Sequence, residues 1–260
     1  MIKPTTRAGA FRRWESLWLQ QRRRKRAHGG ARVAVPPASI ANLVLWLDAG
    51  TLEVGDLDPV DTWQDMSGVG NNVYQDSSSA YPTYVANQLN GHPVLRFDGV
   101  DDSLYSPPYG TLAVTEATIF VVRNTETWAA ALSVAEEESV QEEYLVFDQS
   151  VVHHSEAFNY VELFHQNSHP GYFLQVGRYG NGPTDLQSYL NGVQSTLAVN
   201  VAGAPLGYDG VPRYVRVGGR AFGWSRFSGD IAEILMYGRA LGNSERIGVE
   251  EYLNNKYQLF

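Results

Sequence analysis

Short apolar runs, separated by turn residues, occupy the chain from Ile40 to Gly238. Runs of this length, bounded by Gly, Pro, Asn and Asp, are typical of strands. The predicted strands are "LVLWLD" (43–48), "PVLRFD" (93–98), "ATIFVVRN" (117–124), "YLVFD" (144–148), "NYVELFHQ" (159–166), "GYFLQVG" (171–177), "LQSYL" (186–190), "RYVRVGG" (213–219) and "DIAEILMYG" (230–238). Asn191-Gly192 predicts a two-residue hairpin. The pattern predicts an all-β fold, an antiparallel β-sandwich or jelly roll.

One helix is predicted at the C-terminal end. Val249, Tyr252, Leu253 and Tyr257 follow the spacing i, i+3, i+4, i+8, which places them on one helix face. Asn243 or Ser244 can cap its start. The apolar face must be buried against the sheet or against the segment that precedes the first strand.

The first 35 residues differ from the rest in charge. They hold ten Lys and Arg against one acid, a net charge of +9, whereas the whole chain carries −8 and the remainder therefore −17. Phe11, Trp14, Leu17 and Trp18 have the spacing of an apolar helix stripe, and a basic run follows. The sequence thus predicts a basic amphipathic arm with a Pro-containing linker (1–39) and a β domain (40–260).

We interpret the arm as an anchor, because two exposed tryptophans are costly on a free tail and arginines suit acidic surfaces or phosphates. The residues expected to bind a partner are Arg12, Arg13, Trp14, Trp18, Arg22, Arg23, Arg24, Lys25 and Arg26. A solvated tail and an organelle transit peptide are the alternatives. No apolar core of a secretory signal follows the charged start.

Composition excludes several classes of function. There is no cysteine, so disulfides and thiolate metal sites are absent. No apolar run approaches ~18 residues, so no membrane span is expected. The acidic domain is not expected to bind nucleic acid, and only the arm could do so.

The domain resembles the laminin-G-like, concanavalin A-like lectin/glucanase jelly rolls. The matching pieces are "LVLWLDAGTL", "VDTWQDMSGVGNNVYQ", "PTYVANQLNGHPVLRFDGVDDSL", "ATIFVVRN" and "FSGDIAEILMYGRALGNSERIGVEEYLNNKY", dense over 43–124 and 227–257. The fold is shared by lectins, glycoside hydrolases and structural modules. Gly242 stands where the family usually has a capping Ser. Such domains are similar to those on secreted bacterial proteins and on phage particles, and the basic arm favours the second context.

Asp98, Asp101 and Asp102 follow a predicted strand. Their spacing does not fit a helix–loop–helix calcium loop. Aspartates at a strand end commonly accept hydrogen bonds from turn amides, and the resemblance also implies a structural "FDG-x-DD" turn. We expect no cofactor; a calcium ion with remote ligands is the alternative at this turn.

No catalytic constellation is evident. The paired-carboxylate strand of the related glucanases is missing, and Asp230 and Glu233, three apart, are expected to face opposite ways. Glu233 is expected to pair with a buried Arg or Tyr, and Glu136 and Glu138 to lie in a solvated loop. His153, His154, His165 and His169 do not match a zinc site.

Binding is the remaining class of function. Aromatic candidates for stacking on sugar rings are Tyr160, Tyr172, Tyr179 and Trp224, although most aromatics of a jelly roll fill its core. We expect a non-enzymatic protein of a phage virion (decoration, fibre or tail), oligomeric within the assembly, held to other virion proteins by its arm and displaying a lectin-like domain toward host-surface glycans. The alternatives are a secreted lectin, extracellular or at the cell surface, and a glycoside hydrolase.

Overall fold

The computed structural model describes residues 32–107, 115–125, 129–135, 142–147, 150–155, 159–164, 171–180, 185–195, 199–202, 214–219 and 226–260. In residues 142–147, 150–155, 159–164 and 199–202 it describes the backbone, and of the side chains only that of Val146. The chain divides into two units, Met1–Val33 and Ala34–Phe260. The residues of the predicted anchor therefore lie outside the described residues.

The described strands form two sheets in which every pairing is antiparallel. Sheet A has the order β14-β13-β12-β7-β17-β5-β4, and β1 also pairs with β17. Its strands are β1 (Leu43–Asp48), β4 (Thr83–Leu89), β5 (His92–Asp98), β7 (Ala117–Thr125), β12 (Phe173–Tyr179), β13 (Leu186–Leu190), β14 (Val193–Gln194) and β17 (Ser228–Tyr237).

Sheet B has the order β15-β11-β10-β9-β8-β16-β6-β3-β2. Its strands are β2 (Thr62–Trp63), β3 (Val73–Tyr74), β6 (Leu104–Tyr105), β8 (Ala130–Ala135), β9 (Glu142–Phe147), β10 (Ser150–Ser155), β11 (Asn159–Phe164), β15 (Val199–Ala202) and β16 (Tyr214–Val217). Short 3-10 turns are η1 (Pro37–Ser39), η2 (Ala49–Thr51) and η3 (Ser78–Ala80), and the helix is α2 (Asn243–Tyr257). The predicted all-β antiparallel sandwich with one C-terminal helix is confirmed.

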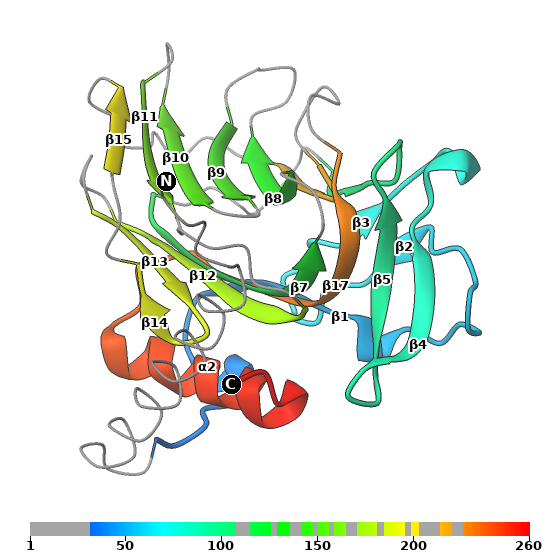
Figure 1. Ribbon diagram of the computed structural model, residues 1–260, viewed down its shortest axis with the longest axis horizontal. Helices are drawn as coiled ribbons and strands as arrows, with labels where there is room; N and C mark the ends of the chain where they lie inside the picture. The colour runs from blue at the N-terminus through cyan, green and yellow to red at the C-terminus, as the bar shows by residue number, and fades with distance from the viewer. Residues whose placement is uncertain are drawn as a thin grey trace, which may run out of the picture. The chain divides into compact units, whose positions relative to one another are not determined.

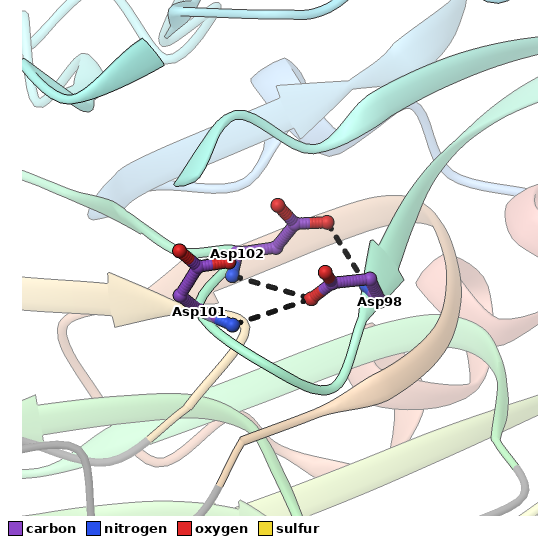
Figure 2. A group of neighbouring side chains, drawn as sticks. All are labelled: Asp98, Asp101 and Asp102. Atoms are coloured by element: carbon purple, nitrogen blue, oxygen red, sulfur yellow. Dashed lines mark hydrogen bonds between the residues drawn. The ribbon is translucent and has the colours of Figure 1, made fainter. Parts of the chain in front are cut away.

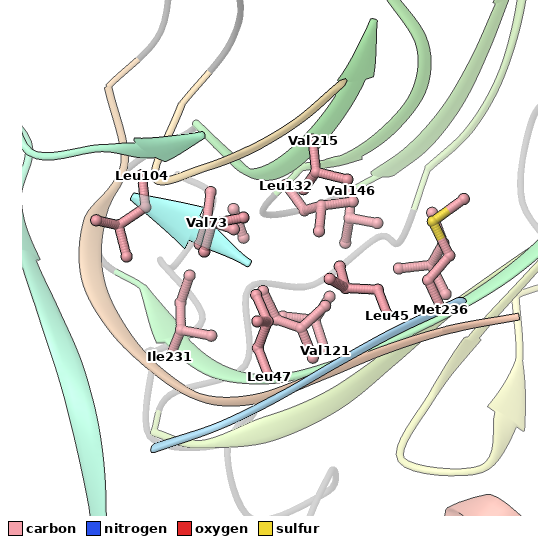
Figure 3. Close-up of a cluster of buried hydrophobic side chains, with 14 of the residues drawn as sticks. Leu45, Leu47, Val73, Leu104, Val121, Leu132, Val146, Val215, Ile231 and Met236 are labelled. Carbon is pink, nitrogen blue, oxygen red and sulfur yellow. The ribbon is translucent and has the colours of Figure 1, made fainter. Parts of the chain in front are cut away.

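The two sheets face each other across a shared apolar core (Figures 1 and 3). Sheet A contributes Leu45, Leu47, Val121, Ile231 and Met236, and sheet B contributes Val73, Leu104, Leu132, Val146 and Val215. Residues at every second position of a strand share one face, so the alternating runs of the sequence place these side chains inward.

A second apolar cluster lies on the other face of sheet A, under α2 (Figure 1). Val249, Leu253 and Tyr257 of α2 are buried there with Phe120 and Leu235 of the sheet. Sheet A is therefore covered on both faces, which explains why β7 and β17 are almost continuously apolar instead of alternating. The predicted apolar face of the helix is confirmed, and the backbone N–H of Val35 also donates to Gly248 O of α2.

Gly242 is the N-cap of α2, so the expectation that Asn243 or Ser244 caps the helix is wrong. Glycine has no side chain to accept from the first turn. The Glu245 carboxylate instead accepts from the Gly242 N–H (Oε2, 3.0 Å) and forms a bidentate pair with Arg239. Glu245 thus supplies one half of a capping box, the acceptor for the N-cap N–H, while the N-cap glycine supplies no side-chain acceptor for the first turn.

The loop between β2 and β3 covers the free edge of β1. Asp65 is its centre: Oδ1 accepts from the N–H of Trp46 in β1 (2.8 Å), and Oδ2 accepts from the N–H groups of Gly70 and Asn71. Asn71 Nδ2 also donates to Val44 O. The loop satisfies backbone groups that an uncovered edge strand would offer to other chains.

Candidate functional site

The three aspartates of the 98–102 turn lie where the chain passes from β5 of sheet A to β6 of sheet B (Figure 2). Asp98 Oδ1 accepts from the backbone N–H groups of Val100, Asp101 and Asp102, at 2.7, 3.3 and 3.4 Å. Asp102 Oδ2 accepts from the Asp98 N–H at 2.9 Å. Gly99 has φ +78°, and a Cβ there would lie 2.7 Å from Ser228 Cβ. These contacts account for the motif as a crossover turn between the sheets.

Burial raises the pKa of Asp102 to about 6, and the neighbouring negative charges of Asp98 and Asp101 add to this effect. The three residues offer carboxylate oxygens within 4.8 Å of one another, a spacing that suits a cation. One of the carboxylates, that of Asp98, already accepts three backbone N–H groups. In the described turn, the carboxylates of Asp98 and Asp102 thus accept hydrogen bonds from backbone N–H groups.

Glu233 belongs to a buried ionic cluster between sheet A and α2. It lies opposite Asp48 across β1 and β17, and Lys256 Nζ contacts both carboxylates, Asp48 Oδ2 at 2.5 Å and Glu233 Oε2 at 2.8 Å. Tyr257 Oη and Trp46 Nε1 also donate to Glu233, each at 2.8 Å. The expected pairing of Glu233 with a buried Tyr is confirmed; its cationic partner is a lysine and not an arginine.

Burial raises the pKa of Glu233, and the nearby Asp48 carboxylate raises it further, while Lys256 and Tyr257 act in the opposite direction. The side chain of Glu233 has 0% of its surface exposed. A substrate cannot reach this carboxylate without removal of α2. The cluster therefore holds the helix on the sheet.

Asp230 has its own partners on the same side of sheet A. Arg96 binds it through two hydrogen bonds of 2.7 and 2.9 Å, and Tyr172 Oη donates to its Oδ2 at 2.5 Å. A β-bulge between Ile231 and Glu233 shifts the alternation of β17. The expectation that Asp230 and Glu233 face opposite ways is therefore wrong, but they remain in separate networks and form no catalytic pair.

Two of the sequence-predicted glycan residues, Tyr172 and Tyr179, are described, and they pack in different apolar clusters. Tyr172 is bound to Asp230, and burial raises its pKa. Tyr179 has 0% exposure and belongs to the core between the sheets. The side chain of Tyr160 and all of Trp224 lie outside the described residues, as do the four histidine side chains and Glu136 and Glu138.

A row of residues that the sequence did not single out crosses the outer face of sheet B. Thr62, Tyr74, Tyr105, Arg216 and Ser133 lie directly opposite one another on β2, β3, β6, β16 and β8. Their neighbours Trp63, Val73, Leu104, Val215 and Val217 point into the core. The signal that could have found the row is the short alternation Val-Tyr, Leu-Tyr and Val-Arg.

Two half-buried tyrosines form the centre of this row. The ring centroids of Tyr74 and Tyr105 are 5.0 Å apart with planes tilted by 48°, and the Arg216 guanidinium lies 5.9 Å from the Tyr105 centroid. Tyr105 Oη donates to Asp76 Oδ2 at 3.0 Å. Burial and this hydrogen bond raise the pKa of Tyr105. We call Tyr74, Tyr105, Arg216 and Asp76 the tyrosine face.

No model of a known protein family matches the sequence, and no curated protein matches it. Solved structures do match. A Trypanosoma rangeli sialidase in complex with the inhibitor DANA matches with a TM-score of 0.53 and 16% identity, over 95% of this chain and 39% of the sialidase. This chain thus spans about two fifths of that enzyme's length.

Domain 4 of AbnA, a GH43 extracellular arabinanase from Geobacillus stearothermophilus, in complex with arabinotriose, matches with a TM-score of 0.54 and 13% identity, over 80% of this chain and 98% of that domain. A mutant of HCR/D matches with a TM-score of 0.56 and 13% identity, over 84% of this chain and 53% of the HCR/D chain. These likenesses confirm the β-sandwich part of the expected resemblance. They lend no support to its laminin-G-like and phage parts. Within the described residues, no helix is long and apolar enough to cross a membrane.

Proposed function

We propose that this protein is a non-enzymatic adhesion protein whose β-sandwich binds carbohydrate. The observation that carries the proposal is the likeness to domain 4 of the arabinanase, because nearly that whole domain is matched and it was solved with an oligosaccharide bound. A fold of this extent thus binds a saccharide in that protein. The sialidase, solved with DANA, is a second sugar-related neighbour.

The buried carboxylates support binding over hydrolysis. Asp48 and Glu233 both contact Lys256 Nζ, so they are close enough to suggest the pair of a retaining glycosidase, whose carboxyl groups lie about 5–5.5 Å apart. However, α2 covers Glu233, and the lysine occupies the space between the two acids. A hydrolase remains the second candidate function.

The test is a glycan array probed with the full-length chain. We expect saturable binding to a restricted set of oligosaccharides, with arabinotriose and sialic acid included among the probes. Absence of binding to any glycan would contradict the proposal. Release of reducing sugar by the wild type, abolished in a Glu233→Gln variant that remains folded, would favour the hydrolase.

We also propose where the protein is located. The arm carries +9 against the −17 of the remaining chain, which supports an anchor that attaches the sandwich to a larger assembly. We propose a phage particle as that assembly. Deletion of residues 1–33, which keeps the contact of Val35 with α2, should leave glycan binding intact and abolish incorporation into purified particles, as measured by mass spectrometry. Equal incorporation of the truncated chain would refute the role of the arm, and absence of the full-length chain from particles would refute the location.

A further inference from the structure

We infer that the tyrosine face is the saccharide-binding surface, on which a neutral oligosaccharide stacks against Tyr74 and Tyr105 and hydrogen-bonds to Asp76. This inference rests on the proposed carbohydrate binding and names its site. Strands β2 and β3 form one end of sheet B (Figure 1). The face lies on the side of β3 and β6 away from the apolar core, because their alternate residues Val73 and Leu104 belong to that core.

The two rings are held in place before any ligand binds. Val73 and Leu104, which precede the tyrosines in β3 and β6, are fully buried and fix both strands to the core. The hydrogen bond to Asp76 and the Arg216 guanidinium orient Tyr105 further. Rigid aromatic side chains lose little conformational freedom on binding, so a preorganised pair favours affinity.

The polar groups around the rings suit sugar hydroxyls. Asp76 is exposed, and one of its two carboxylate oxygens accepts from Tyr105. Among the described residues, neither the second Asp76 oxygen nor the Tyr74 hydroxyl has a hydrogen-bond partner, so both can serve a ligand. Ligand sites commonly combine aromatic surface with a few polar groups that fix orientation.

The charges of the face select among ligand classes. The exposed charge of the face is the Asp76 carboxylate, whereas the Arg216 guanidinium beside Tyr105 is half-buried, with its Nε atom fully buried. An exposed carboxylate beside the rings disfavours phosphate-bearing ligands such as nucleic acids or phospholipids. A neutral oligosaccharide offers apolar C–H faces to the rings and hydroxyl donors to the carboxylate. That combination matches the tyrosine face, whereas a wholly apolar partner would desolvate the second Asp76 oxygen without giving it a donor.

The test is calorimetric titration of the full chain with the oligosaccharide that gives the strongest array signal. Tyr105→Ala and Tyr74→Ala should each weaken binding about tenfold or more, and Asp76→Asn several-fold, on the order expected for central contact residues. Tyr105→Phe keeps the ring and should retain most of the affinity. The matched control is Tyr252→Ala, because this half-buried tyrosine lies on α2, beyond the other face of sheet A.

Circular dichroism would check that each variant is folded. If Tyr105→Ala is not folded, the two single variants Tyr74→Ala and Asp76→Asn still test the inference. Wild-type affinity in both Tyr74→Ala and Asp76→Asn would show that the tyrosine face is not the binding site, but it would not contradict the proposed carbohydrate binding. A wild-type chain that binds no glycan would overturn both.

Discussion

Lys256 attaches α2 to sheet A through an ion pair with each of two carboxylates. Its ammonium group lies between two carboxylates of neighbouring strands, and one of them, Glu233, is fully buried. A buried charge without its partner is far less favourable than the complete pair, because neither water nor a counter-ion replaces the lost contact.

Lys256→Met should therefore lower the free energy of unfolding by about 3–5 kcal/mol, the range for breaking a buried ion pair from one side. Urea denaturation at neutral pH would measure it. The double variant Lys256→Met/Glu233→Gln should be less destabilised than the two single changes added together, since it removes the orphaned charge. Strictly additive effects would show that the two residues do not act as a unit.

Asp102 should give the protein a specific pH dependence. Its pKa is raised from 3.8 to about 6, so the folded state holds the proton more tightly than the unfolded state. The stability that this proton contributes is complete below pH 3.8 and is lost as the pH rises through about 6. Asp102→Asn stays neutral and can still accept from the Asp98 N–H.

The unfolding free energy of the wild type should consequently fall relative to Asp102→Asn between pH 4 and pH 7, as followed by denaturant unfolding at several pH values. A difference between the two proteins that does not change with pH would contradict the raised pKa. The neighbouring exposed Asp98 offers no equivalent control, because its oxygen holds the turn.

At the scale of elements, α2 closes the outer cluster of sheet A. Leu253 has 1% exposure and packs there with Val249 and Tyr257. Leu253→Ala should cost about 2–5 kcal/mol of stability through lost burial and the remaining cavity. Asn255→Ala, exposed on the same helix, should change stability by less than about 0.5 kcal/mol. Equal effects in chemical denaturation would show that the helix does not support the fold.

The sequence predicts the long elements well because their patterns are strong. The continuous apolar run of β7, the i, i+4 face of α2 and the Asn191-Gly192 turn all have their expected structures, and the two turn residues have φ of 48° and 72°. The strand β4 was not predicted, although Asn90-Gly91 carries the same hairpin signal, with φ of 49° and 88°.

Sites were harder to predict than elements. Tyr74 and Tyr105 are 31 positions apart, in strands of two residues, and only the pairing of β3 with β6 brings them together. The cation of the Glu233 cluster comes from a helix 23 positions later in the chain. A β-bulge reversed the expected direction of one carboxylate. Long-range register decides such contacts, and local periodicity does not contain it.

For the whole molecule, the proposed function requires the described sandwich to act as a rigid binding scaffold. Its two apolar clusters fix both faces of sheet A, and the buried acids Asp230 and Glu233 are paired with Arg96 and Lys256. The tyrosine face lies on the outer side of sheet B, on short strands whose other side is core. We therefore expect the protein to bind a saccharide without changing it chemically.

The most direct test incubates the full chain with its best-bound oligosaccharide, measures saturation by calorimetry and analyses the recovered sugar by mass spectrometry. We expect saturable binding and an oligosaccharide of unchanged mass after prolonged incubation. Shortened products that are absent from a heat-denatured control, or no heat of binding at any concentration, would contradict this expectation.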